Sequence, residues 1–276
     1  MTAQDWLDRD ALARHSVEPR QWMDFRQATL PDGQRIIDAT NSSGLAYTIL
    51  PDRGLDVWTA TYNDRPLTWI SQGAPQLPDM ALPWLQQFNG GLIVTCGLTH
   101  AGVAETDPET GEFRDLHGQY SRLRAVDVAV DRSDPGALVL RGAVAEAKMF
   151  GVQLRLERRF TLRLGDPAIY LSDRVTNRGD QPAPLMVLYH VNMGYPLIAE
   201  GARFDTPHAA VYPRDAEARK GYVSWAEYAG PVPRYNEQVY FHHLKQRDGQ
   251  TRALIGRDNF GLLFEWDPAQ MPYLTQ

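Results

Sequence analysis

Residues 152–164 constrain the fold more than any other segment of the chain, because apolar and polar residues alternate along them. One face would carry Val152, Leu154, Leu156, Phe160, Leu162 and Leu164, and the other Gln153, Arg155, Glu157, Arg159, Thr161 and Arg163. Successive side chains of a β-strand point to opposite faces of the sheet. A strand with one apolar and one charged face is typical of an antiparallel sheet that is buried on one side only.

The rest of the chain consists mostly of short strand-like segments separated by turn residues. The predicted strands are residues 34–40, 45–50, 55–62, 67–70, 92–98, 120–130, 137–147, 168–176, 185–191, 237–244, 251–255 and 260–266. A short amphipathic helix is predicted at about residues 5–14, and a long loop at 99–118. No repeat or shift in composition marks a boundary, so we predict a single all-β domain over residues 1–276, built as a mostly antiparallel sandwich.

Composition and charge exclude several classes of protein. The single cysteine, Cys96, rules out an internal disulfide framework and is typical of a reducing compartment. No segment approaches the roughly 20 apolar residues of a membrane span, and no secretory leader is visible, so we expect a cytoplasmic protein without a membrane partner. The net charge of −6 includes no basic run, which argues against nucleic acid as a partner. No metal, nucleotide or dinucleotide motif is present, so we expect no metal and no cofactor.

The most informative candidate residues lie at the end of the apolar segment LMVLYHVNMGYP, residues 185–196. On a strand, His190 and Asn192 would project from the same face. An imidazole beside an amide at the end of a strand is a common way for a β-scaffold to present acid–base chemistry to a pocket. The alternative is a buried core histidine without a catalytic role.

Two further residues are candidates for binding. Arg53 lies in the tight turn PDRG, where its guanidinium could bind sugar hydroxyls, a phosphate or a carboxylate. The alternative is a surface arginine paired with Asp52 or Asp56. His100 follows a predicted strand and is a candidate cleft residue; the alternative is an ordinary loop histidine.

Five segments together resemble one known family. They are PDRGLDVW (51–58), FNGGLIVTCGLTHAG (88–102), LHGQYSRLRA (116–125), LYHVNMGYP (188–196) and EQVYFHHL (237–244). In this order they resemble the aldose 1-epimerase (galactose mutarotase) superfamily, and within it a divergent, largely uncharacterised branch of aldose-epimerase-like bacterial proteins. The resemblance extends from about residue 34 to the end of the chain. Its most specific part is the His-Gly pair at His117 followed by the His-x-Asn at His190.

The resemblance implies a galactose mutarotase-like supersandwich with a sugar-binding cleft on its concave face. It implies that the protein interconverts the anomers of a monosaccharide by acid–base ring opening and closure, as a cofactor-free isomerase. His190 would be the general acid at the ring oxygen and His117 would assist there. Glu237 resembles the position of a hydroxyl-binding carboxylate. His242 would face away from it on a strand, so at most one of these two residues would point into the cleft.

The family pattern is incomplete in this chain. The glutamate that serves as general base in the family lies beyond the last predicted strand, and no glutamate follows Glu265. We therefore expect a chain that lacks the C-terminal strands of the sandwich. The missing base leaves two alternatives open, which are a non-catalytic carbohydrate-binding protein with the same cleft and a sugar-phosphate epimerase. The protein would be a monomer or a homodimer.

Overall fold

The computed structural model describes residues 7–73 and 76–276, so positions 5 and 6 of the predicted helix lie outside the described residues. The chain divides into two compact units, unit 1 (Met1–Met193) and unit 2 (Gly194–Gln276). The single domain over residues 1–276 stays a prediction. No helix among the described residues has the length and apolar character needed to cross a membrane.

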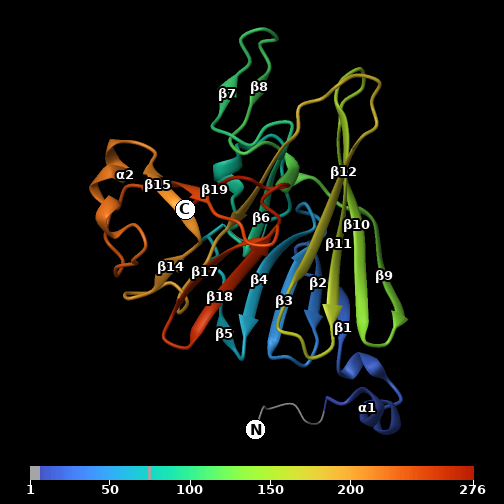
Figure 1. Cartoon of the computed structure of the whole chain (residues 1–276). Helices are drawn as coiled ribbons and strands as arrows, with labels where there is room; N and C mark the ends of the chain where they lie inside the picture. The colour runs from blue at the N-terminus through green and yellow to red at the C-terminus, as the bar shows by residue number, and fades with distance from the viewer. Residues whose placement is uncertain (1–6, 74–75) are drawn as a thin grey trace. The chain divides into compact units, whose positions relative to one another are not determined.

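Unit 1 is built from β-strands and a few short helices (Figure 1). Its strands are β1 (Asp24–Thr29), β2 (Arg35–Thr40), β3 (Leu45–Leu50), β4 (Asp56–Tyr62), β5 (Arg65–Pro66), β6 (Ile93–Leu98), β7 (Glu105–Thr106), β8 (Phe113–Arg114), β9 (Val126–Asp134), β10 (Ala137–Ala147), β11 (Gln153–Arg163), β12 (Tyr170–Asn177) and β13 (Met186–Val191). Its helices are α1 (Arg9–His15) and the single-turn 3-10 helices η1 (Pro19–Gln21), η2 (Trp84–Gln87) and η3 (Tyr120–Arg122).

Two sheets of unit 1 form a sandwich. The larger has the order β1-β2-β3-β4-β6-β13, with β5 added to β4, and the smaller has the order β12-β11-β10-β9. Their inner faces meet at Tyr47 of β3 and Phe160 of β11, whose ring centroids are 6.5 Å apart. All strand pairs among the described residues are antiparallel, which confirms the predicted all-β architecture.

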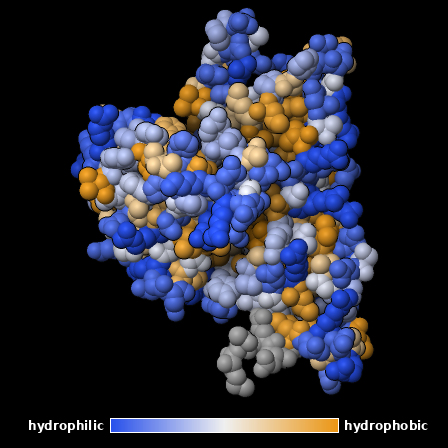
Figure 2. All heavy atoms as spheres, in the orientation of Figure 1, coloured by the Kyte–Doolittle hydropathy of each residue, from blue (hydrophilic) through white to orange (hydrophobic). Residues whose placement is uncertain are grey.

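Strand β11 has the predicted two-faced pattern. Its alternate residues Leu154, Leu156, Phe160 and Leu162 are buried, while the residues between them are exposed or half-buried. In Figure 2 the flank of unit 1 formed by β9–β12 is correspondingly mostly hydrophilic. The inward register also contains a charged residue, Arg158, which is only 1% exposed.

Unit 2 contains two three-stranded sheets and one short helix. Its elements are β14 (Arg203–Asp205), β15 (His208–Pro213), α2 (Ala216–Lys220), η4 (Tyr222–Ser224), β16 (Tyr240–Leu244), β17 (Thr251–Arg257), β18 (Phe260–Trp266) and β19 (Leu274–Thr275). The sheet orders are β14-β17-β18 and β15-β16-β19. The predicted strands at residues 251–255 and 260–266 are thus confirmed as the hairpin β17–β18.

Three predicted strands differ from the structure by more than two residues. Residues 67–70 make only isolated bridges, because the Ala60 N–H bonds to the Thr68 hydroxyl instead of a backbone carbonyl. Residues 120–125 precede β9 and include η3, whose residues are all buried. Residues 237–239 precede β16, because its partner strand ends at Pro213, which faces Tyr240 and has no N–H to donate.

The predicted N-terminal helix exists, but it begins later than expected. Helix α1 begins at Arg9 because the Asp8 carboxylate accepts a hydrogen bond from the Ala11 N–H at 2.7 Å, as an N-cap residue does. None of its residues is buried. The capping residue, and not the apolar pattern, therefore sets the start of this helix.

Candidate functional site

His190 lies near the end of β13, half-buried, on the same face as an apolar cluster. Its Cα partner across the sheet is Val94 of β6. Val94 and Cys96 form a buried cluster with Trp84, against which Leu188 packs. Cys96 is fully buried and burial raises the pKa of its thiol, as expected for a small hydrophobic residue and not for a nucleophile.

His117 is presented by a tight turn that requires glycine at the next position. Its φ is +59°, and that of Gly118 is +75°. A Cβ at position 118 would collide with the carbonyl oxygen of His100, so the turn requires glycine there. The His117 N–H donates to the Gly102 carbonyl at 2.9 Å, and its Nδ1 lies 3.3 Å from the Ala101 carbonyl oxygen.

The structure brings the two predicted catalytic histidines together. The ring centroids of His117 and His190 are 5.6 Å apart. Trp84 contacts His117 edge-on at 4.8 Å, and Phe88 contacts His190 at 5.8 Å. Trp84 and Phe88 stack on each other at 4.4 Å, and Ser121 fixes the indole by accepting from its Nε1 at 3.1 Å. Two titratable rings therefore lie beside an aromatic surface, a type of surface on which the apolar face of a sugar can stack.

Asn192 is close to His190, but its side-chain amide is engaged with the backbone. Its Nδ2 donates to the Gly91 carbonyl at 2.8 Å and lies 3.4 Å from the His190 carbonyl oxygen. These contacts connect the end of β13 to the segment at Gly91 and hold the backbone that carries His190.

Arg53 is not a surface residue, because it is only 4% exposed. Its Nε donates to the Gln76 carbonyl at 2.6 Å, and its Nη2 has no partner among residues 7–73 and 76–276. Burial lowers the pKa of this guanidinium to about 10, against the opposing effect of Asp56, so it stays charged at neutral pH. It lines a small pocket with Trp58, whose indole N–H is likewise without a partner in the described chain. The pocket has a volume of about 10 Å³, so it admits at most one water-sized oxygen atom to these two donors.

The Arg53 pocket adjoins the histidine pair. Val94, the residue opposite His190 on the sheet, lines it, and so does Ser121, which holds the Trp84 indole. Unit 1 therefore combines two imidazoles, an aromatic surface and a buried guanidinium in one region.

Of the other predicted binding residues, His100 belongs to unit 1 and two belong to unit 2. His100 is buried, and its Nε2 lies 2.8 Å from the Val103 carbonyl oxygen. Glu237 is exposed and pairs with Arg214 at 2.9 Å. His242 of β16 is 5% exposed and lies among Phe204, Trp225 and His208. The roles of all the predicted site residues stay predictions.

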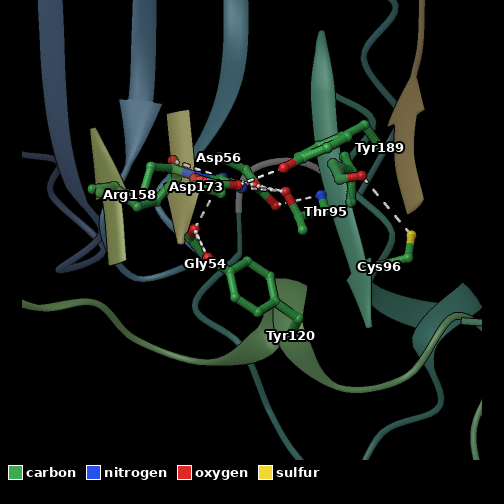
Figure 3. A network of polar contacts seen from close by, with 10 residues as sticks. Gly54, Asp56, Thr95, Cys96, Tyr120, Arg158, Asp173 and Tyr189 are labelled. Carbon is green, nitrogen blue, oxygen red and sulfur yellow. Dashed lines mark hydrogen bonds and ion pairs between the residues drawn. The ribbon is translucent and has the colours of Figure 1, made fainter. Parts of the chain in front are cut away.

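Sequence reasoning missed a buried ionic network behind the site (Figure 3). The Arg158 guanidinium donates to Asp56 at 2.6 Å and makes two hydrogen bonds to Asp173, at 2.8 and 2.6 Å. It also donates to the Thr95 hydroxyl at 2.8 Å, and Thr95 in turn donates to Asp56. The alternation of the sequence could have revealed it, since Arg158 lies two residues from both Leu156 and Phe160 and therefore on the same, buried face of the strand.

The network joins both sheets to the strand that carries His190. Tyr189 of β13 donates its hydroxyl to Asp173 of β12 at 2.7 Å. Because neighbouring residues of a strand point to opposite faces, Tyr189 is directed toward the network while His190 is directed away from it. The buried charges therefore hold the backbone of β13 from behind.

The buried imidazole of His242 predicts a pH-dependent stability. Burial, helped by the nearby His208, lowers its pKa to about 4, and Gln276 only partly opposes this shift. A pKa below the unfolded value means that protonation favours unfolding. The contribution of neutral His242 to the free energy of unfolding is constant above about pH 6.5. It is lost as the pH falls toward 4, and the loss is at most about 3 kcal/mol.

This prediction is tested by urea denaturation of the wild type and His242→Phe between pH 4 and 8. We expect the stability of the variant relative to the wild type to rise by about 1–3 kcal/mol as the pH falls from 7 to 4. Parallel pH profiles for the two proteins would contradict the assignment.

Comparison with known proteins identifies the family. A family model described as Domain of unknown function (DUF4432) matches residues 31–276. The chain belongs to the DUF4432 family. No curated protein sequence matches this DUF4432 chain.

Solved structures share the fold of this DUF4432 protein. A "putative aldose 1-epimerase" from Klebsiella pneumoniae subsp. pneumoniae MGH 78578 is 25% identical, with a TM-score of 0.81 over 95% of this chain and 76% of that chain. Galactose 1-epimerase from Lactobacillus acidophilus NCFM is 13% identical, with a TM-score of 0.55 over 87% of this chain and 81% of that chain. The Slr1438 protein from Synechocystis sp. PCC 6803 is 14% identical, with a TM-score of 0.53 over 88% of this chain and 85% of that chain. These similarities confirm the predicted galactose mutarotase-like fold and the family resemblance.

Proposed function

We propose that this protein is a cytoplasmic, cofactor-free aldose 1-epimerase that interconverts the anomers of a free monosaccharide. The observation that carries the proposal is the pair of imidazoles, His117 and His190, whose centroids are 5.6 Å apart beside the aromatic surface of Trp84 and Phe88. The similarity to the Klebsiella protein, described as a "putative aldose 1-epimerase", supports the same reaction class.

The reaction needs an acid at the ring oxygen and a base at the anomeric hydroxyl, the two oxygen atoms bonded to C1. The anomeric hydroxyl loses a proton while the ring oxygen gains one, the C1–O5 bond breaks, and the open aldehyde rotates and closes on its other face. A positioned acid or base contributes about 10²–10⁴-fold when its pKa lies near the working pH, a condition that histidine meets almost without adjustment. In this proposal His190 gives the proton to the ring oxygen and His117 holds or assists at the same oxygen. Solvent water takes the proton of the anomeric hydroxyl, because no glutamate follows Glu265 to fill the role of base.

The other predicted residues bind or orient the sugar in this proposal. Arg53 binds one sugar hydroxyl oxygen through its Nη2, because the pocket that it shares with Trp58 has a volume of about 10 Å³ and admits a single oxygen atom. Asn192 orients His190 through the backbone contacts of its amide. Glu237 and His242 are the proposed binding residues of unit 2, and either the monomer or a homodimer carries the site.

The proposal is tested by following freshly dissolved α-D-glucose, α-D-galactose and rarer aldoses by polarimetry or NMR. We expect the protein to accelerate the relaxation of at least one neutral aldose and His243→Ala, an exposed control on β16, to behave like the wild type. Saturable sugar binding without acceleration would instead establish a carbohydrate-binding protein. Acceleration confined to aldose 6-phosphates would establish a sugar-phosphate epimerase.

A further inference from the structure

His117 depends on a short segment of loop for both its backbone and its ring. Its N–H donates to the carbonyl of Gly102, and its Nδ1 lies 3.3 Å from the carbonyl oxygen of Ala101. A carbonyl oxygen can only accept, so the proton of the neutral ring belongs on Nδ1 and the lone pair on Nε2. The Ala101 carbonyl therefore leaves Nε2 of His117 to act on a ligand, as an acceptor when the ring is neutral and as a donor to a sugar ring oxygen when the ring is protonated.

The imidazole of His100 holds this segment in place. Its Nε2 lies 2.8 Å from the Val103 carbonyl oxygen, so the ring closes residues 100–103 into a turn that contains Ala101 and Gly102. Gly102 lies against the Cε1–Nε2 edge of the ring, since a Cβ there would be 3.5 Å from His100 Cε1. The backbone of His100 also touches the turn that presents His117, because its carbonyl oxygen fills the space where a side chain at Gly118 would stand.

The second nitrogen of His100 faces the base of the β7–β8 hairpin. His100 Nδ1 lies 3.7 Å from Glu105 Oε1, and the same oxygen accepts from Arg114 Nη1 at 3.3 Å. With only 5% of its surface exposed, His100 is enclosed between Val103 and Glu105. Both of its ring nitrogens therefore face protein groups, which leaves this side chain little capacity to bind a sugar directly.

We propose that His100 is a positioning residue, which fixes the orientation and the tautomer of His117 through the carbonyl groups of Ala101 and Gly102. This inference rests on the proposed function only for its kinetic consequence. It assigns His100 a role within the protein in place of the predicted contact with substrate.

The test combines kinetics with imidazole NMR of ¹⁵N-labelled protein. In His100→Leu we expect kcat to fall about 10- to 100-fold with KM unchanged, since a small misplacement of a reacting group has effects of this size. We expect the His117 ring to change from the single Nδ1–H tautomer to a mixture. His100→Gln, which keeps an N–H donor near the Nε2 position, should restore most of the kcat and most of the Nδ1–H tautomer of His117. His243→Gln should change neither quantity.

Two results would overturn the proposal. One is an unchanged His117 tautomer in His100→Leu, with the fold confirmed by unchanged His190 ring signals. The other is a raised KM with an unchanged kcat, which would show direct contact between His100 and the sugar. If His100→Leu does not fold, His100→Asn, too short to reach Val103, takes its place in both measurements. If the wild type accelerates no aldose, the proposed function fails while the NMR measurement still decides the role of His100.

Discussion

Replacing His190 with alanine is expected to reduce the acceleration of anomer exchange by about 10²–10⁴-fold, the contribution of a positioned general acid. The loss should appear in kcat, because the ring oxygen develops its charge only as the C1–O5 bond breaks. It is measured by NMR exchange between the α and β signals of the preferred aldose at neutral pH. His190→Gln, which keeps a donor but cannot titrate, should recover little of the activity.

Two observations separate a catalytic loss from a structural one. The half-buried His190 ring leaves the buried cluster of Trp84, Val94 and Cys96 intact when it is removed, so the melting temperature of His190→Ala should stay close to that of the wild type. His117→Ala should also lose activity, and the double variant should lose less than the product of the two single effects if the rings act on the same oxygen. Full activity in His190→Ala would refute the assignment.

Replacing Arg158 with methionine is expected to destabilise the protein by about 3–5 kcal/mol, the usual cost of removing one partner from a buried ion pair. The substitution leaves the carboxylates of Asp56 and Asp173 buried without their cation, although methionine fills a similar volume. In a protein of this size the melting temperature should fall by roughly 5–10 °C. The measurement is chemical denaturation with the linear extrapolation of unfolding free energy.

A neighbouring arginine provides the matched control. Arg159 lies on the same strand but on its exposed face, so Arg159→Met should change stability by no more than about 0.5 kcal/mol. Equal effects of the two substitutions would show that the network is not a major source of stability. Replacing all three buried charges by apolar residues should recover part of the loss, since no carboxylate is then left unpaired.

Much of the architecture followed from local sequence patterns. The alternation at residues 152–164 and the glycine turns correctly predicted antiparallel strands, because the period of two is a property of the strand itself. The boundaries were less predictable where a partner decides them, as at Tyr240, which faces Pro213 at the end of β15. Arg158 shows the same limit. The alternation of the strand placed it on the buried face, but its two carboxylate partners are distant in sequence and could not be predicted.

The candidate site also has properties that are local in the sequence and others that depend on long-range packing. The sequence by itself determined that His117 precedes a glycine in the loop predicted at residues 99–118 and that His190 lies on an apolar strand, because both are local properties of the chain. Only the tertiary structure decided that the two rings lie 5.6 Å apart, that Trp84 and Phe88 form the surface beside them, and that Arg53 is buried. These facts depend on which distant segments pack together, and packing is decided by the burial of the whole apolar surface and not by any single stretch of residues.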